Sequence, residues 1–452
     1  MPGQKTTLMT RKERRKLGQS CRNKIGRVDQ AKWDPKDRKH DVVDLLLASQ
    51  RGRIPSLLSI KWIRMLASPF GFFRGAAPVM AADLAPLPNT GLMVQLCGDA
   101  HVQNLGAFEG ADGRLIFDIN DFDDTIVGPW ELDVKRMAAS LVLAGREAGN
   151  SDRQCKNAVL AFACSYHVWM RQFSQMPVVE LARFQIYRKI DPLRSVLRKA
   201  ERTTPLHNLN TLTVLRRGKH VFRELRPTQY HVPKKEADSV VASLRAYMHT
   251  LLPERAHFFA QYRVGDVAFR VVGTGSIGLR DYVLLMFAGA ISDPLFLQIK
   301  EEPPSAYAAY LPNSPVAAHQ GQRVAEGGRA MQMQSDIFLG WTSIAGRDYV
   351  VRQLRDHKAS IEEADLKGNG LFEYAEMCGE LLSKGHARSG DPCAISGYLG
   401  NNDRFEQAMA TFGISYADQT LKDWEEFKRG LQAGKIRTAK LPAPAKAKRH
   451  KS

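Results

Sequence analysis

The sequence lacks the cysteine patterns that indicate a disulfide framework or a zinc site. Only six cysteines occur among the 452 residues, and no two of them form a C-x-x-C pair. That spacing is typical of structural zinc sites, whereas dense and regularly spaced cysteines are typical of small secreted domains. We therefore expect reduced cysteines that pack in a core, no zinc, and a cytoplasmic protein.

Long apolar runs are also missing. No stretch approaches the roughly 18 apolar residues that a membrane-spanning helix needs, and the basic N-terminal segment has no apolar run typical of a signal peptide. Hydrophobic residues still make up 44% of the chain, which is enough to bury a large core. These features predict a soluble, globular protein with no membrane span and with one large or two medium domains.

Acidic residues are scarce at both ends of the chain. Residues 1–40 carry a net charge of +9 and residues 435–452 a net charge of +7, so the remaining body holds only +2 of the total of +18. Basic segments of this kind are typical of disordered arms, which contact nucleic acid or anionic surfaces or are simply solvated. We expect a disordered arm over residues 1–40 and a disordered tail over residues 431–452, and we favour solvated tails.

Apolar periodicity divides the body of the chain into three segments. Helical spacing predominates in residues 41–255, although short apolar runs at 92–96 and 115–119 predict two buried strands. Residues 256–356 contain strand-like runs, and residues 357–430 return to helical spacing. This order predicts an α+β protein in which the last helices complete a helical lobe.

Acidic and amide side chains are concentrated where the two predicted strands end. Residues 97–104 read CGDAHVQN and residues 117–124 read FDINDFDD. Asp99, Asn104 and Asp121 therefore lie where strands give way to loops, close together. Carboxylates crowded in this way need a cation, although turns also favour Asp and Asn for local hydrogen bonds. We expect a functional site here.

A glycine-rich segment follows the first strand of the sheet-rich region. Residues 273–278 read GTGSIG, but residues 281–287 continue as a strand, whereas a dinucleotide-binding unit would open a helix at the third glycine. Strand, glycine turn and strand form the phosphate-covering lid of protein kinases. A tight hairpin without a ligand is the alternative. The candidate nucleotide-binding residues are Gly273, Gly275, Ser276 and Gly278.

The next apolar strand, residues 295–299, ends at Lys300. An ammonium group beside a glycine-rich hairpin suits the α- and β-phosphates of a nucleotide. Such a lysine needs an acid to hold it, and the predicted helix over residues 317–338 carries Glu326 as the candidate partner. A solvated strand end for Lys300 and an exposed position for Glu326 are the alternatives.

Taken together, these segments resemble the bacterial family DUF2252, which is grouped with the protein-kinase-like and aminoglycoside-phosphotransferase-like superfamily. The resemblance spans about residues 40–425. It implies a two-lobed kinase-like fold, ATP and Mg²⁺ as cofactors, and transfer of phosphate to an unknown hydroxyl acceptor. The segments that carry it are residues 68–75, 96–104, 117–124, 128–136, 273–278 and 293–301.

Carried over to this sequence, the resemblance assigns roles to the acidic loops. Asp99 would orient the acceptor hydroxyl and take its proton, and Asn104 would hold Mg²⁺. Asp121 resembles the second metal ligand, which bridges the metal to the nucleotide phosphates. Asp118 and Asp123 remain alternatives for that ligand.

Three further residues of the matching segments receive no catalytic or metal-binding role. Asp133 resembles a buried aspartate that braces the catalytic loop. His101 departs from the phosphotransferase pattern, in which a histidine precedes the Gly-Asp pair, so it receives no chemical step. Arg74 is expected to be structural.

The order of the parts differs from that of ordinary kinases, in which the glycine loop and the lysine precede the catalytic loop. Here Gly273, Lys300 and Glu326 follow Asp99 and Asp121. The spacing implies a circular permutation, in which residues 371–386 supply the helix that leads into the catalytic loop. Such a rearrangement is tolerated because the same contacts form whatever the connection order.

Two other functions fit parts of the sequence. One is a catalytically silent nucleotide-binding scaffold whose basic tails contact RNA or a membrane. The other is a metal-dependent hydrolase, which would leave Lys300 and the glycine hairpin without a task. The hydrolase would use an acid and histidine cluster made of Asp99, His101, Asp118 and Asp121.

Overall fold

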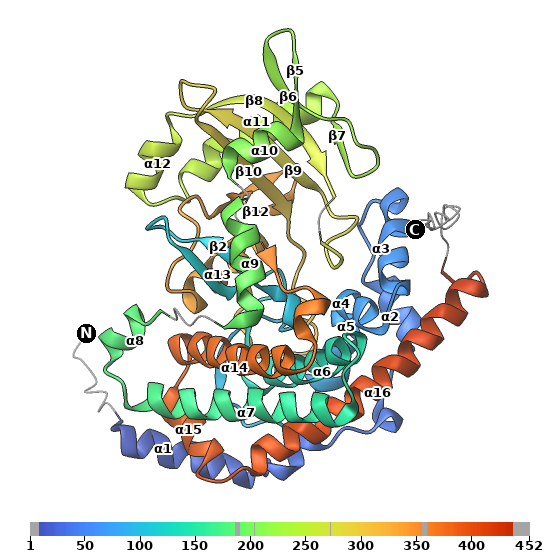
Figure 1. Cartoon of the computed structure of the whole chain (residues 1–452), viewed down its shortest axis with the longest axis vertical. Coiled ribbons are helices and arrows are strands. Elements are labelled where there is room, and N and C mark those ends of the chain that lie inside the picture. The colour runs from blue at the N-terminus through green and yellow to red at the C-terminus, as the bar shows by residue number, and fades with distance from the viewer. Residues whose placement is uncertain (1–8, 186–189, 203, 272, 355–358, 437–452) are drawn as a thin grey trace, which may run out of the picture.

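The structure is a computed structural model that describes residues 9–185, 190–202, 204–271, 273–354 and 359–436. An antiparallel sheet with its helices forms the upper part of the molecule in Figure 1, and a group of packed helices forms the lower part. We call these the sheet part and the helical part. The mixture of helices and strands confirms the predicted α+β class.

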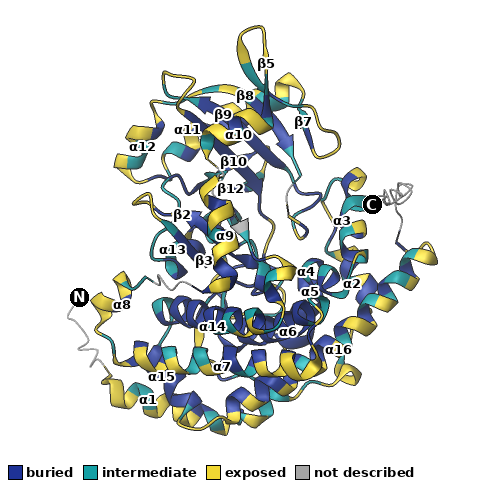
Figure 2. Cartoon of the chain, in the orientation of Figure 1, coloured by how far each residue is buried: buried dark blue, intermediate teal, exposed yellow. Residues whose placement is uncertain are grey.

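The sheet part contains a six-stranded antiparallel sheet in the order β11-β12-β10-β9-β8-β7. The central strands β9 and β10 are buried along almost their whole length (Figure 2). The strands are β7 (Gln229–His231), β8 (Arg263–Arg270), β9 (Asp281–Phe287), β10 (Pro294–Glu301), β11 (Gly340–Ile344) and β12 (Arg347–Gln353).

Two separate apolar clusters explain why β9 and β10 read as continuous apolar runs. Leu284 and Leu297 pack with α11 on one face of the sheet, while Val283 and Phe296 pack with α10 and β6 on the other. Strands covered on both faces lose the alternation of a half-exposed strand. The surrounding elements are α10 (Pro205–Leu212), β5 (Thr213–Arg216), β6 (Lys219–Phe222), α11 (Lys234–Met248), α12 (Pro253–Phe259) and α13 (Gln320–Met331).

The helical part surrounds the largest apolar cluster, in which Trp130 stacks on Tyr166 with ring centroids 5.4 Å apart. The long helices α6, α7, α14 and α16 pack on one another around this cluster. The helices are α1 (Arg11–Ser20), α2 (Val42–Ala48), α3 (Pro55–Leu66), α4 (Pro69–Gly75), α5 (Ala77–Leu84), α6 (Glu131–Glu147), α7 (Asp152–Gln175), α8 (Val178–Arg183), α9 (Asp191–Arg202), α14 (Asn369–Ser389), α15 (Pro392–Leu399) and α16 (Arg404–Gln432).

Short strands present the acidic loops between the two parts. β1 (Met93–Leu96) pairs with β4 (Ile126–Pro129), and β2 (Leu105–Glu109) pairs with β3 (Leu115–Ile119) and with β13 (Ala359–Ser360). The strands predicted over 92–96 and 115–119 are therefore confirmed. Short 3-10 helices lie at Cys21–Asn23, Val28–Ala31, Pro35–Asp37, Val102–Asn104 and Glu363–Leu366.

The N-terminal region differs from the disordered arm predicted over residues 1–40. Helix α1 packs so closely on α15 that a Cβ at Gly18 would overlap the carbonyl oxygen of Ala394. Arg22 donates to the carbonyl oxygens of Gly397 and Tyr398 at the end of α15. Its charge therefore satisfies free carbonyl groups of a helix C-terminus, which net charge alone does not reveal.

The two ends of the chain also bear on the predicted disordered arm and tail. Residues 1–8 and 437–452 lie outside the described residues, whereas α16 extends to Gln432, into the tail predicted over 431–452. Within the described ranges, no helix has both the length and the apolar character needed to span a membrane.

Arg38 tests whether this N-terminal region is an integral part of the fold. Its guanidinium group bridges Asp83 of α5 and Asp423 of α16, with N–O distances of 2.6 and 2.7 Å, and both carboxylates are buried. Arg38→Ala would leave two buried charges unpaired, so we expect the free energy of unfolding to fall by about 3–5 kcal/mol in urea titrations. Lys36→Ala, at an exposed position, should change it by less than about 0.5 kcal/mol. Equal effects of the two substitutions would contradict this account.

Candidate active site

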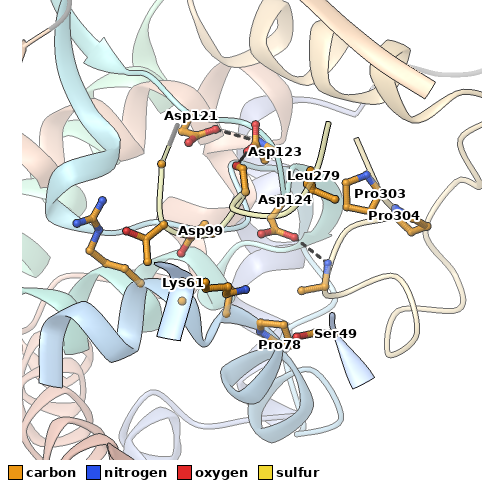
Figure 3. A pocket seen from close by; sticks show the side chains of 18 of the residues that line it. Ser49, Lys61, Pro78, Asp99, Asp121, Asp123, Asp124, Leu279, Pro303 and Pro304 are labelled. Carbon is orange, nitrogen blue, oxygen red and sulfur yellow. Dashed lines mark hydrogen bonds between the residues drawn. The ribbon is translucent and has the colours of Figure 1, made fainter. Parts of the chain in front are cut away.

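A cavity of about 330 Å³ lies between the sheet part and the helical part (Figure 3). Its wall combines the two acidic loops, the glycine-rich segment and residues of α2 to α5. Gly278 and Lys300 lie just outside this wall, around a smaller space beneath the glycine-rich segment. The predicted site residues that line the cavity itself are Asp99, Asn104, Asp121, Gly273, Gly275 and Ser276.

Asp133 fixes the loop that carries Asp99. Its fully buried carboxylate accepts hydrogen bonds from the backbone N–H groups of Cys97 and Gly98, at 2.8 and 3.0 Å. Gly98 has a φ of 83°, and a Cβ there would overlap the carbonyl oxygen of Asp124. Glycine is therefore required for the two acidic loops to meet, and Asp133 is the brace that the resemblance implies.

Asp99 is held in one orientation by a cation from α6. The Arg136 guanidinium has no exposed side-chain surface and lies 2.5 Å from a carboxylate oxygen of Asp99. Burial raises the pKa of Asp99 to about 6 against the effect of Arg136, and the charges of Asp124 and Asp121 add to the rise. Sequence reasoning assigned Arg136 no role, because several charged residues surround it in the first turns of α6 and none stands out in the sequence.

The contacts of His101, which lies next to Asp99, indicate a structural role. Its Nε2 lies 3.7 Å from the Asp99 carboxylate, and its Nδ1 accepts a hydrogen bond from the backbone N–H of Gln103. Burial, with the charges of Arg74 and Arg136, holds the pKa of His101 well below its ordinary value. The ring is therefore neutral near pH 7 and shapes the loop.

Asn104 and Asp121 both reach the cavity. The side-chain amide nitrogen of Asn104 donates to the carbonyl oxygen of Asp99 at 2.6 Å, which leaves the amide oxygen available as a ligand. Burial raises the pKa of Asp121, and the neighbouring Asp123 raises it further, against the charges of Lys300 and Arg352. A cation would relieve the repulsion between the two carboxylates.

Lys300 joins the sheet part to these acids through Asp123. Its buried ammonium group contacts the Asp123 carboxylate, which also accepts a hydrogen bond of 2.9 Å from the Ser276 hydroxyl. Loss of solvent alone would raise the pKa of Asp123, but the Lys300 charge holds it below its ordinary value. The lysine and the acid cluster therefore meet, with Asp123 rather than Asp121 in direct contact.

Glu326 is not the partner of Lys300, so that prediction is wrong. Helix α13 turns Val324 and Ala325 toward the core, which leaves Glu326 exposed and bonded to Gln322 at 2.8 Å. Arg323 of the same helix donates to the carbonyl oxygens of Asp123 and Thr125 instead. The apolar pattern locates a helix, but it does not show which acid faces a lysine on another element.

Asp118 lies outside the cavity wall. Its carboxylate contacts the Lys384 ammonium of α14, and both side chains are buried. The four-residue cluster of the hydrolase alternative therefore does not form. Moreover, in the part of the chain that the structure describes, no three His, Cys, Asp or Glu side chains are arranged to hold a metal ion.

Two arginines that sequence reasoning missed hold the glycine-rich segment in place. Arg53 donates to the carbonyl oxygens of Gly275 and Ile277, each at 2.7 Å, and Arg64 donates to that of Gly273 at 2.5 Å. Gly273 has a φ of 64°, a conformation that favours glycine. The segment is thus fixed over the cavity by α3 and the turn before it, and no local pattern announces such long-range contacts.

Most of the segments that form this cavity lie within a match to a known protein family. The profile of the family DUF2252, described as an uncharacterized protein conserved in bacteria, matches residues 53–430. The chain belongs to DUF2252. The matched region includes both acidic loops, the glycine-rich segment and Lys300, so every lining residue from Arg53 onward lies within the DUF2252 region. No curated protein and no solved structure matches the chain.

Asp281 makes the stability of the sheet part dependent on pH. It pairs with Lys300 across the β9–β10 ladder, accepts a hydrogen bond of 2.7 Å from Gln298, and is buried. Burial raises the pKa of Asp281 to about 7 despite the charge of Lys300, whereas an unfolded aspartate titrates near about 3.9. At a pH between these two pKa values, Asp281 carries a proton in the folded chain but not in the unfolded chain. Its contribution to the free energy of unfolding therefore decreases as the pH rises.

Asp281→Asn removes this titration. Relative to the wild type, the variant should gain free energy of unfolding as the pH rises from about 4 to about 7, with no further gain above that. Urea titrations at several pH values across this window measure the difference. Parallel stability profiles for the two proteins would show that Asp281 does not titrate as described.

Proposed function

We propose that the protein is a kinase-like phosphotransferase that binds ATP with Mg²⁺ between its sheet part and its helical part and transfers phosphate to a hydroxyl acceptor. One observation carries the proposal. Asp99, Asn104 and Asp121 share a cavity with the glycine-rich segment, and Lys300 contacts the same acidic loop. These are the residue types that phosphoryl transfer needs for positioning and for neutralising charge.

The order of elements in the sheet part supports this proposal. β8 is followed by the glycine-rich segment, β9, then β10 with Lys300, and then α13. In kinases a glycine loop, a lysine on the third strand and a helix follow in that order. The departure is that Asp123 of the metal loop, rather than an acid of the helix, holds the lysine.

The contacts of α14 support a circular permutation. Ser389 accepts a hydrogen bond of 3.2 Å from the backbone N–H of Gln95 in β1, and His386 lies 3.3 Å from the Asp133 carboxylate. A helix late in the chain thus packs on the strand that leads to Asp99. This is the position proposed for the helix that precedes the catalytic loop in a kinase.

Each residue has a defined task in this proposal. Asp99 orients the acceptor hydroxyl and accepts its proton, while Arg136 keeps the carboxylate in place. Asn104 and Asp121 would hold Mg²⁺, which when bound neutralises charge on the nucleotide phosphates. Mg²⁺ commonly takes only one or two carboxylates and completes its shell with phosphates and water. An incomplete set of protein ligands therefore fits this ion.

Asp121→Ala tests the proposal. Loss of this ligand should remove Mg²⁺-dependent binding of a non-hydrolysable ATP analogue in calorimetry. It should also lower ATP turnover by at least about a hundredfold, as expected when a charge-stabilising group is lost. Asp112→Ala, at an exposed position in the turn between β2 and β3, is the matched control. Unchanged analogue binding and turnover in Asp121→Ala, with its fold intact, would refute the assignment.

A label-transfer assay with the wild-type protein distinguishes the proposed phosphotransferase from the remaining alternative, the catalytically silent scaffold. A catalytically silent scaffold would bind the analogue but transfer no label from ATP to any component of a metabolite extract. A γ-phosphate label detects phosphoryl transfer, and an α-phosphate label detects nucleotidyl transfer.

A further inference from the structure

The cavity wall formed by α2 to α5 is basic, in contrast to the acidic loops. Arg53 precedes α3, Lys61 lies on α3, and Arg74 lies at the end of α4; all three line the cavity. Figure 3 shows Lys61 across the cavity from Asp123 and Asp124, on the same side as Ser49 and Pro78. The three cations therefore face space where a ligand can bind.

Lys61 is a buried cation without an acidic partner. The residue is 2% exposed, and among the described residues its ammonium group donates to the amide oxygen of Gln50 at 3.3 Å and lies 5.9 Å from the centre of the Trp62 ring. Burial lowers the pKa of Lys61 well below its ordinary value, the charge of Arg53 lowers it further, and the charge of Asp124 opposes this. A buried ammonium group without a counter-charge in contact is unfavourable, and an anionic ligand would stabilise its charged form.

Arg74 adds a second unmatched cation. Within the described ranges its guanidinium forms no hydrogen bond or ion pair, its Nε is buried without a partner, and it lies 6.0 Å from the Phe70 ring. The charges that act on it most include Asp99. Arg74 was expected to be structural, yet it reaches the cavity beside the proposed acceptor-orienting residue.

Three of the acids that line the cavity already have other partners. Asp99 is paired with Arg136, and Asp123 is paired with Lys300 and Ser276. Asp124 accepts a hydrogen bond of 2.8 Å from the backbone N–H of Ala306. Among the described residues no acid of the cavity forms a salt bridge with Lys61 or Arg74, so both cations can bind an anionic ligand.

We propose that Lys61, Arg74 and Arg53 bind an anionic group of the acceptor, a phosphate or a carboxylate, so that the substrate is a small hydroxyl compound with negative charge. The inference rests on the proposed function. A guanidinium and an ammonium group together provide the donors that such an anion requires. A polyamine acceptor would meet like charges on this wall and is disfavoured.

The position of the wall assigns the anion to the acceptor rather than to the nucleotide. Lys300 and the glycine-rich segment belong to the sheet part, whereas Lys61 and Arg74 belong to the helical part. From Lys61 the cavity wall continues along Ser49 and Pro78. The acceptor would therefore lie between this wall and Asp99, with its hydroxyl group at the carboxylate.

The experiment uses inorganic phosphate as the probe and the full-length chain. Thermal midpoints are measured in sodium phosphate and in sodium chloride of equal ionic strength, with and without an ATP analogue and Mg²⁺. Phosphate should raise the midpoint of the wild type and of Lys422→Met, an exposed control on α16. In Lys61→Met and in Arg74→Gln, phosphate should bind at least about tenfold more weakly, the loss of one charged hydrogen bond.

A second readout separates a ligand-binding role for Lys61 from a structural one. Lys61→Met replaces an unpaired buried charge with an apolar chain of similar length, so the ligand-free variant should melt at a higher temperature than the wild type. A purely structural lysine would give the opposite shift. The affinity for the ATP analogue should stay the same in Lys61→Met, because among the described residues Lys61 forms no hydrogen bond with the glycine-rich segment or with Lys300.

Three outcomes would overturn the inference: no phosphate-specific stabilisation of the wild type, full retention of it in Lys61→Met, or competition between phosphate and the ATP analogue. Phosphate binding by a wild type that does not bind the analogue would overturn the proposed function while supporting the anionic wall. With labelled ATP, product should form only from the metabolite fraction retained by an anion exchanger. Product that forms only from the unretained fraction would exclude an anionic acceptor.

Discussion

The contact between Lys300 and Asp123 is the interaction on which the site depends. It joins the central strand of the sheet part to the loop that follows β3, and Ser276 of the glycine-rich segment bonds to the same carboxylate. Because the pair is largely removed from water, loss of either partner would leave a buried charge. The contact therefore fixes the distance between the two parts and keeps the cavity in one shape.

Around this contact, the acids and bases of the chain divide into paired and unpaired groups. Asp118 is paired with Lys384 and Asp99 with Arg136, so these acids are neutralised within the fold. Glu302 also lines the cavity, yet neither of its buried carboxylate oxygens has a hydrogen-bond partner among the described residues. Burial raises the pKa of Glu302 well above its ordinary value, and the charge of Asp123 raises it further.

Three charged groups without a salt-bridge partner among the described residues face the same cavity. Glu302 lies beside the acidic loop, and Lys61 and Arg74 lie on the basic wall. Unmatched polar groups are unfavourable for folding, and functional sites are where proteins commonly retain them. Their distribution supports a site that accepts a metal-bound nucleotide at one end and an anion at the other.

Much of the fold could be predicted from local patterns. The strands at 92–96 and 115–119, the sheet strands around Lys300 and helix α14 follow from apolar runs and periodicity, which depend on burial alone. The grouping of Asp99, Asn104 and Asp121 also followed, because strand ends that meet in a loop place their side chains together. The ordered N-terminal region did not, since its arginines bind carbonyl groups of α15, far away in the chain.

No local sequence pattern could predict which charged residues pair with one another. Glu326 was the predicted counter-charge for Lys300, but the packing of α13 leaves it exposed, and Asp123 contacts the lysine instead. The same holds for Lys384, which sits in a buried helix because Asp118 lies opposite. Lys61 escaped notice and Arg74 was expected to be structural for a related reason, because an unpaired cation is recognised only after its surroundings are known.

A crystal structure of the protein with a non-hydrolysable ATP analogue and Mn²⁺ in place of Mg²⁺ tests the central claim most directly, because the anomalous signal of manganese locates the ion without ambiguity. The account predicts a manganese peak beside Asp121 and Asn104, with the nucleotide phosphates between that ion and the glycine-rich segment. Nucleotide and metal bound outside this cavity, or no binding at millimolar concentrations of both, would contradict it.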